Sequence, residues 1–161
     1  MKKERLGELI LACQDSMYHV AKTLLRSDAD CADAIGEAIV KAFARLDSLR
    51  DDRHAKTWLT RIVINECYNV LRKQSRIVSL EEYPPEDRPD DGRQYTELYD
   101  ALGRLPEQMR LCVTLYYLEG YSVRETAALL ETSENVVKKR LARARQLLKD
   151  DLTTEGLICE H

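Results

Sequence analysis

Several features that mark common enzyme and secreted-protein classes are missing from this sequence of 161 residues. Its five cysteines are odd in number, widely spaced and form no CxxC pair, which argues against a disulfide framework or a zinc site. No apolar run approaches the length of a membrane span, and the first residues lack the apolar core of a signal peptide. We therefore expect a cytoplasmic protein with reduced thiols, no membrane insertion, no metal and no other cofactor.

Strand-like alternation of polar and apolar residues is also absent. Aromatic residues make up only 6% of the chain and charged residues 33%, a composition that favours a helix-rich protein. One acidic segment holds three of the four prolines and shows no hydrophobic periodicity, which predicts an extended linker. The predicted fold class is all-α, with two small helical domains. We predict a first domain over residues 1–76, the linker over 77–95, a second domain over 96–152 and a tail over 153–161.

The net charge of −3 conceals a segregation of charge along the chain. Residues 81–100 hold eight acids against two arginines, whereas residues 101–149 hold nine Lys or Arg against five acids. The negative charge is therefore concentrated in the linker and the tail, and an acidic pI does not exclude a nucleic-acid partner.

The C-terminal third has the pattern of a helix-turn-helix. Ser122 precedes an apolar-periodic run and Glu125 follows three positions later, which is the spacing of a capping box at the start of a helix. The run ends at a three-residue turn, and its last residue, Ser133, is a good N-cap for a second helix. That helix carries an apolar stripe of Val137, Leu141, Ala144 and Leu148, and an outward side with Asn135, Lys138, Lys139, Arg143 and Gln146.

Amides and cations on the outward side of such a helix suit base edges in the major groove and phosphate groups. The alternative is a solvated basic face, because basic amphipathic helices are common. The short first helix and the tight turn favour DNA.

The first domain is predicted to contain three or four helices. We expect a first helix over residues 7–25, a second that is capped by Asp28 or Asp30 and ends near Leu46, and a third over residues 56–73. A polar face opposite the apolar residues of the second helix consists of Asp30, Asp33, Glu37 and Lys41.

The three carboxylates on that face have the spacing of a metal site, but no histidine is adjacent and no second acidic helix completes the shell. A solvated face, or better a docking face for a basic partner, is the preferred interpretation.

The third helix combines aromatic, cationic and amide side chains on one side. Aromatic planes beside cations are suited to unstacked bases. For Trp58, the only tryptophan, packing in the core is an equally good interpretation. Glu66 falls among the apolar positions, where an interhelical partner is its only explanation. The polar side gathers Trp58, Arg61, Asn65, Tyr68, Asn69 and Arg72.

These two patterns, in this order, resemble those of sigma factors of the extracytoplasmic-function (ECF) group in the sigma-70 family. Residues 28–51 and 54–76 are similar to the second conserved region of these proteins. Residues 101–110 and 122–148 are similar to their fourth region. The resemblance covers nearly the whole chain apart from the linker and the tail.

The resemblance implies a promoter-specificity subunit without an active site of its own. Its partners would be bacterial core RNA polymerase, promoter DNA and an anti-sigma factor that occludes both domains. Polymerase would bind Asp30, Asp33, Glu37 and Lys41, with Asp33 and Glu37 docked on the clamp helices. The melted minus-ten element would bind Arg50, Arg53, Trp58, Arg61, Asn65, Tyr68, Asn69, Arg72 and Lys73, with a flipped base in the loop 47–53. The minus-thirty-five element would bind Arg124, Ser133, Glu134, Asn135, Lys138, Lys139 and Arg143 as duplex.

Two positions depart from the family pattern. Gly36 stands where the docking motif usually has glutamine, which removes a polar contact and lowers helix propensity by about 1 kcal/mol relative to alanine. Glu131 stands where the turn often has glycine, which predicts a non-glycine residue in a left-handed conformation.

Two rival classes remain open. A free-standing repressor or activator would use only the helix-turn-helix and would bind duplex DNA tightly without polymerase. A metal-dependent enzyme would use Asp30, Asp33 and Glu37 together with His54.

Overall fold

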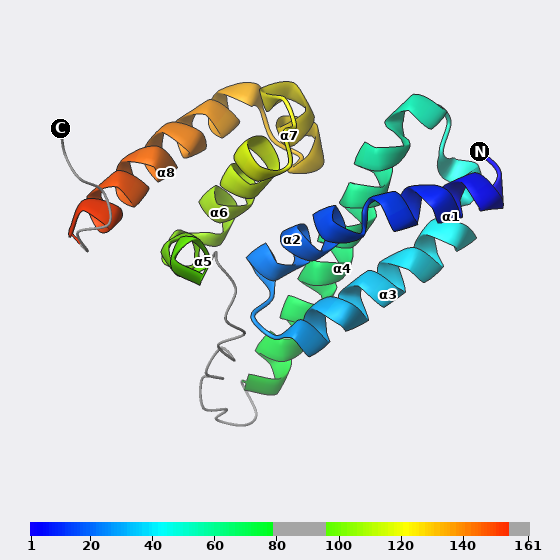
Figure 1. Cartoon of the computed structure of the whole chain (residues 1–161), viewed down its shortest axis with the longest axis horizontal. Helices are drawn as coiled ribbons and strands as arrows, with labels where there is room; N and C mark the ends of the chain where they lie inside the picture. Colours follow the sequence, from blue (N-terminus) through cyan, green and yellow to red (C-terminus); the bar gives the residue numbers. More distant parts are fainter. Residues whose placement is uncertain (79–95, 155–161) are drawn as a thin grey trace. The chain divides into compact units, whose positions relative to one another are not determined.

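A computed structural model of the chain describes residues 1–78 and 96–154, with side chains described for 1–76 and 100–150. Every regular element in these residues is helical, which confirms the predicted all-α class (Figure 1). The chain separates into two compact units, Met1–Arg88 and Pro89–His161.

The division between the units falls inside the range predicted as the linker. The linker itself lies almost wholly outside the described residues, as do the last seven residues, which include Cys159. No helix within residues 1–78 or 96–154 is both long and apolar enough to cross a lipid bilayer.

The first unit is built on a pair of packed helices, α3 and α4, with α2 against both and α1 against α2 and α3. Two short 3-10 turns connect α3 to α4. The elements are α1 (Lys3–Ala12), α2 (Gln14–Leu24), α3 (Asp28–Ala44), η1 (Leu46–Ser48), η2 (Asp52–His54) and α4 (Ala55–Val78).

The prediction of one helix over residues 7–25 was wrong, because the segment is divided at Cys13. That residue has φ −101° and ψ 11°, so α1 ends there and α2 begins at the next residue. One buried stripe nevertheless runs through both helices without changing its spacing, which explains why the pattern predicted a single helix. The stripe comprises Leu6, Ile10, Cys13, Met17, Val20 and Leu24.

The helix α3 begins at Asp28, but neither predicted aspartate is its cap. Ser27 is the N-cap, and its side chain accepts a hydrogen bond from the backbone nitrogen of Asp30 at 3.2 Å. The interior side of α3 is formed by small residues, which allow the larger apolar residues of α4 to approach closely. The buried small residues of α3 are Cys31, Ala34, Ala38 and Ala42, and α4 contributes Leu59, Ile62, Val63 and Cys67.

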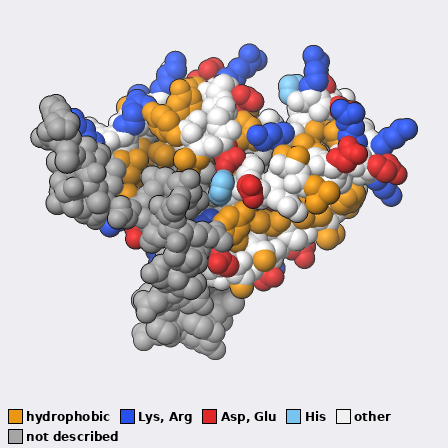
Figure 2. Space-filling model, viewed as in Figure 1, with side chains coloured by type: hydrophobic (Ala, Val, Ile, Leu, Met, Phe, Trp, Pro, Cys, Tyr) orange, Lys and Arg blue, Asp and Glu red, His pale blue; other side chains and the backbone are white. Residues whose placement is uncertain are grey.

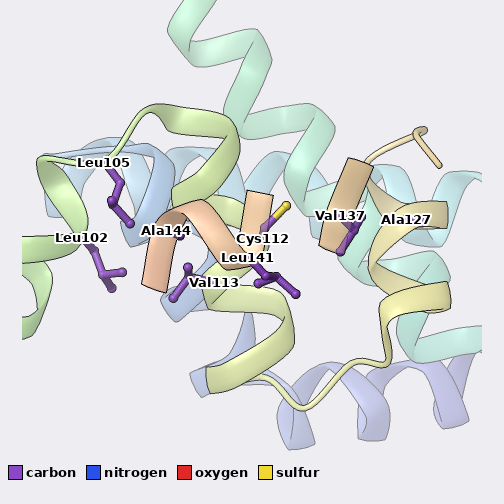
Figure 3. Packing of buried hydrophobic residues seen from close by; sticks show 8 residues of the cluster. All are labelled: Leu102, Leu105, Cys112, Val113, Ala127, Val137, Leu141 and Ala144. Atoms are coloured by element: carbon purple, nitrogen blue, oxygen red, sulfur yellow. The ribbon is translucent and has the colours of Figure 1, made fainter. Parts of the chain in front are cut away.

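The second unit contains the predicted helix-turn-helix. In Figure 3 its buried side chains converge from α5 to α8 into one cluster, with Val137, Leu141 and Ala144 contributed by α8. Leu148, the last member of the predicted stripe, is partly buried against this cluster. The elements are α5 (Thr96–Gly103), α6 (Glu107–Val113), the π-helical turn η3 (Thr114–Leu118), α7 (Val123–Leu129) and α8 (Glu134–Thr154).

The local signals of the helix-turn-helix are confirmed. Ser122 Oγ accepts from the Glu125 backbone nitrogen at 3.0 Å, and the Glu125 carboxylate accepts from the Ser122 backbone nitrogen at 3.1 Å. Glu131 has φ 54°, in the left-handed region, and Ser133 Oγ accepts from the Val136 backbone nitrogen at 3.2 Å. The capping box starts α7, and the four residues that include Glu131 and Ser133 connect the end of α7 to the start of α8, which fixes the angle between the two helices.

Candidate polymerase and nucleic-acid interfaces

The predicted acidic face of α3 divides into two pairs of residues. Asp33 and Glu37 are exposed, and neither makes a hydrogen bond or ion pair with another described residue. Asp30 and Lys41 are partly buried at the edge of the helix that faces α4. Asp30 Oδ2 accepts a hydrogen bond from Gln74 Nε2, and Lys41 forms an ion pair with Glu66.

This division corrects the expectation that all four residues lie opposite the apolar side of α3. On a helical wheel Asp30 and Lys41 are only a few tens of degrees from the buried stripe, so long side chains on α4 reach them. The exposed charge of α3 is therefore acidic only, as a docking face for a basic partner requires.

Large apolar side chains lie on the exposed side of α3, and their exposure was not predicted from the sequence. Val40 is 64% exposed and Phe43 37%, and Gly36, on the turn before Val40, is also exposed. A Cβ atom added to Gly36 would meet nothing within 4 Å, so packing does not require glycine at this position. The signal that reveals this surface is Val40 itself, a large apolar residue far from the buried stripe of the helix.

Trp58, in the first turn of α4, is neither fully buried nor free. Its Nε1 donates to Ser48 Oγ at 3.2 Å, and the Ser48 hydroxyl donates to the Arg45 carbonyl at 2.7 Å. The indole is thus held at the junction of η1 and α4, and the residue is partly exposed. This partial exposure argues against the alternative that Trp58 is a core residue.

Further along α4, four polar side chains are joined in a row. Lys41 from α3 and Asn69 Nδ2 both donate to Glu66 Oε1, the second at 3.3 Å. Asn69 Oδ1 accepts from Arg72 Nη2. Glu66 is 6% exposed, and Lys41 on α3 is the interhelical partner expected for a carboxylate at an apolar position of α4.

The other α4 residues predicted to bind the minus-ten element lie on the accessible side of this helix. Arg61 and Tyr68 are partly buried, and each makes at least one interaction. Asn65, Arg72 and Lys73 are exposed. The structure therefore brings an aromatic ring, amides and cations to one side of one helix, as stacking on unpaired bases and contact with phosphates require.

The segment between η1 and α4 carries an internally compensated charge. Asp51 accepts hydrogen bonds from the Arg53 backbone nitrogen at 3.0 Å and from Arg53 Nη2 at 2.9 Å. These bonds from Arg53 lower the pKa of the Asp51 carboxyl. Arg50 is exposed, and the Arg53 side chain remains 86% exposed despite its partner. Both arginines are accessible beside the loop.

The outward side of α8 is as the helical wheel predicts. All of the predicted duplex-binding residues are exposed, and Figure 2 shows Lys and Arg side chains gathered along the outer edge of α8. Ser133 has a second role, since its hydroxyl is the cap of α8. The exposed residues are Arg124, Ser133, Glu134, Asn135, Lys138, Lys139 and Arg143.

One further cation of α8 is engaged within the unit. Arg145 Nη1 donates to the hydroxyl of Tyr117 at 2.7 Å, and Tyr117 and the adjacent Leu118 are 49% and 43% exposed. They belong to the π-helical turn η3, a type of distortion that is frequent at functional sites. This exposed apolar pair was not predicted from the sequence.

Cys31 and Cys67 are buried in the first unit. Burial raises the pKa of Cys31 to about 11 and that of Cys67 to about 12, so both thiols are poor nucleophiles at neutral pH. Within the described parts of the chain, no group of three or more His, Cys, Asp or Glu residues is arranged to hold a metal ion.

Comparison with known proteins identifies the family of the chain. The family model described as Sigma-70 region 2 matches residues 9–77, and the model described as Sigma-70, region 4 matches residues 95–148. The chain is 36% identical over 135 residues to the ECF RNA polymerase sigma factor SigM of Mycobacterium tuberculosis, covering 82% of this chain and 69% of that protein. It is 28% identical to the RNA polymerase sigma factor SigV of Bacillus subtilis, over 97% of this chain and 98% of that protein.

Among solved structures, the sigma factor RpoE of Bartonella quintana, in a co-crystal with the anti-sigma factor NepR, has the same fold. The TM-score is 0.80 at 24% sequence identity, over 93% of this chain and 98% of the other. Two sequence regions in the family's order, a relative identical at more than a third of the aligned positions and the shared fold lead to one conclusion. The chain belongs to the sigma-70 family, as an RNA polymerase sigma factor of the ECF group.

Proposed function

We propose that this chain binds bacterial core RNA polymerase, recognises promoters with two spaced elements, melts the downstream element and so starts transcription. One observation supports the proposal: each unit exposes polar and cationic side chains of a different character. The polar side of α4 suits unpaired bases, and the outward side of α8 suits duplex DNA.

Polymerase docking is assigned to the exposed side of α3. Asp33 and Glu37 supply acidic charge, and Val40 supplies an apolar centre beside them. A partner surface with cations around an apolar contact would match this arrangement. Asp30 and Lys41 contribute indirectly, because their side chains hold α3 against α4.

Promoter melting is assigned to α4 and the loop before it. The indole of Trp58, fixed by Ser48, offers a flat surface for a base that has left the duplex, and stacking on such a surface contributes about 1–3 kcal/mol per base. Arg50 and Arg53 are accessible to the strand at the loop. Asn65, Arg72 and Lys73 follow along α4.

Recognition of the upstream element is assigned to α8. Asn135 is near the start of the helix, where side chains of a recognition helix reach base edges, and the cations of the following turns are placed for base edges and phosphates. The exposed pair Tyr117 and Leu118 is assigned to an apolar contact with polymerase.

Regulation and cellular location follow from the proposed role of the chain. The chain has no active site of its own in this scheme, because RNA synthesis is performed by polymerase. It acts with polymerase in the cytoplasm. An anti-sigma factor is the expected antagonist, and the co-crystal of the Bartonella quintana protein with NepR supports this expectation.

The test is transcription in vitro with bacterial core polymerase, the full chain and a library of promoter fragments, followed by sequencing of the transcripts. Start sites that share two spaced upstream elements are the expected result. A matched pair of variants separates the elements: Lys139→Ala with Arg143→Ala should weaken the upstream preference, and Trp58→Ala should reduce opening. If a folded chain and a cognate core polymerase give no specific transcripts, while the chain alone binds duplex tightly, a free-standing DNA-binding regulator is the correct function.

A further inference from the structure

Glu66 is a charged side chain within the apolar side of α4. A carboxylate removed from water is unfavourable unless an opposite charge and hydrogen bonds compensate for the lost hydration. At Glu66 the compensation comes from two helices, since Lys41 on α3 and Asn69 on α4 donate to the same oxygen atom. The compensated carboxylate therefore connects the helix proposed to bind polymerase with the helix proposed to bind the melted strand.

The charge of Glu66 also determines the orientation of the Asn69 amide. An ionised carboxylate can only accept hydrogen bonds, so Asn69 must turn its NH₂ group toward Glu66 and its oxygen away. That oxygen accepts from Arg72, which can only donate. Both neighbours thus require the same orientation. The four residues Lys41, Glu66, Asn69 and Arg72, here named the polar row, have one consistent direction of donors and acceptors.

The outer end of the polar row lies on the proposed promoter surface. Arg72 is exposed, and a free arginine side chain loses considerable rotamer entropy when it binds a partner. The bond to Asn69 restricts the guanidinium before DNA arrives, which reduces that loss. We infer that Glu66 is a positioning residue for promoter-strand binding, which acts through Asn69 to hold Arg72 in place for the strand. This inference rests on the strand-binding function proposed for α4.

If Glu66 served only to stabilise the fold, its replacement would change stability rather than strand binding. Buried ion pairs contribute little to stability compared with apolar residues of similar volume, and α3 is already closed against α4 by small buried residues. The bond from Gln74 to Asp30 also joins α3 to α4 but does not include Asn69 or Arg72. It therefore provides a matched control for a lost polar link between the two helices.

The experiment is a double-mutant cycle in the holoenzyme. The probe is a short single-stranded oligonucleotide copied from the minus-ten region of a promoter recovered in the transcription assay. Glu66→Gln keeps the shape of the side chain but removes its charge, and it should weaken binding of this strand about tenfold. In an Arg72→Ala background the same substitution should change binding by less than about twofold.

Two further variants separate positioning from folding. Lys41→Met combined with Glu66→Leu replaces the ion pair with apolar side chains, and it should lose strand affinity as Glu66→Gln does while its thermal unfolding shows an intact fold. Gln74→Met should leave strand affinity within about twofold of the unmodified chain.

Unchanged strand affinity in Glu66→Gln would overturn the inference. An equal loss of strand affinity when Glu66→Gln is introduced into the unmodified chain and into Arg72→Ala would also overturn it. If Arg72→Ala itself does not weaken strand binding, the promoter surface assigned to α4 is wrong and the inference falls with it. A loss with Arg72→Ala but none with Glu66→Gln would leave the proposed function intact and reject only the role of Glu66.

Discussion

Replacement of Lys139 and Arg143 by alanine should change the salt dependence of promoter binding by a calculable amount. Both side chains are exposed on the outward side of α8, about one helical turn apart, and the helix is held by its cap and by the buried stripe beneath it. Alanine at both positions preserves helix propensity, so the fold should be unaffected. The substitutions therefore remove charge from one surface without moving it.

Each phosphate contact contributes about 0.9 to the slope of log K against log salt for duplex DNA. If both side chains contact phosphates, the slope should be shallower by about 1.8. Between about 50 and about 200 mM salt, the unmodified holoenzyme should then lose about tenfold more affinity than the variant. If one of the two reads a base edge as well, its loss should also relax sequence preference at one position of the upstream element by about 1–3 kcal/mol.

The assay is a salt titration of holoenzyme binding to duplex that carries the upstream element. Lys3→Ala combined with Arg5→Ala is the matched control, because it removes the same charge from exposed positions of α1. The control should have the slope of the unmodified protein. An unchanged slope in the α8 variant would refute the placement, and an equal change in the control would show that net charge, rather than position, is responsible.

Four other outcomes are expected. Asp33→Lys should abolish binding to core polymerase without lowering the unfolding temperature, because the carboxylate is exposed and makes no contact within the described part of its unit; retained affinity in a pull-down would reject docking on α3. Trp58→Ala should slow promoter opening more than it weakens the closed complex. Opening is measured with a fluorescent base in the minus-ten region, and equal losses in opening and in closed-complex binding would indicate that the indole has only a packing role. Gly36→Ala should stabilise the chain by about 1 kcal/mol in chemical unfolding, since the helix gains propensity and the added methyl group meets no neighbour; a loss of stability would contradict that. Native Cys31 and Cys67 should react with iodoacetamide about two to three orders of magnitude more slowly than unfolded thiols, and stability should fall as pH rises above about 9, because unfolded thiols ionise there while folded ones stay protonated up to about 11 and 12; rapid labelling at neutral pH would show that the core opens.

The extent to which the sequence predicted the structure differs between the two units. In the second unit each signal is local: Ser122 and Glu125 form the predicted box, Glu131 takes the predicted left-handed conformation, and Ser133 caps α8. Such signals depend on residues only a few positions apart, and they are therefore readable from sequence.

In the first unit the wrong or missing predictions have identifiable physical causes. The hydrophobic stripe continues through Cys13, so periodicity alone could not reveal the break between α1 and α2. Asp28 and Asp30 are acceptable caps by residue type, but Ser27 is the residue whose extended backbone brings its hydroxyl to the helix start. The exposed Val40 was readable from the helical wheel of α3 and was overlooked.

The sequence by itself determined the helical class, the presence of a helix-turn-helix, its cationic outward side and the aromatic side of α4, since each depends on spacing within one element. Only the tertiary structure decided which polar side chains are already bonded within the unit before a partner binds. In the sequence nothing distinguishes these side chains from free polar residues. In the structure Gln74 bonds to Asp30, 44 residues away, and Glu66 bonds to Lys41 and Asn69. Asn69 in turn bonds to Arg72. The physical reason is that the availability of a polar side chain depends on what packs against it, and this is known only when α3 and α4 lie side by side.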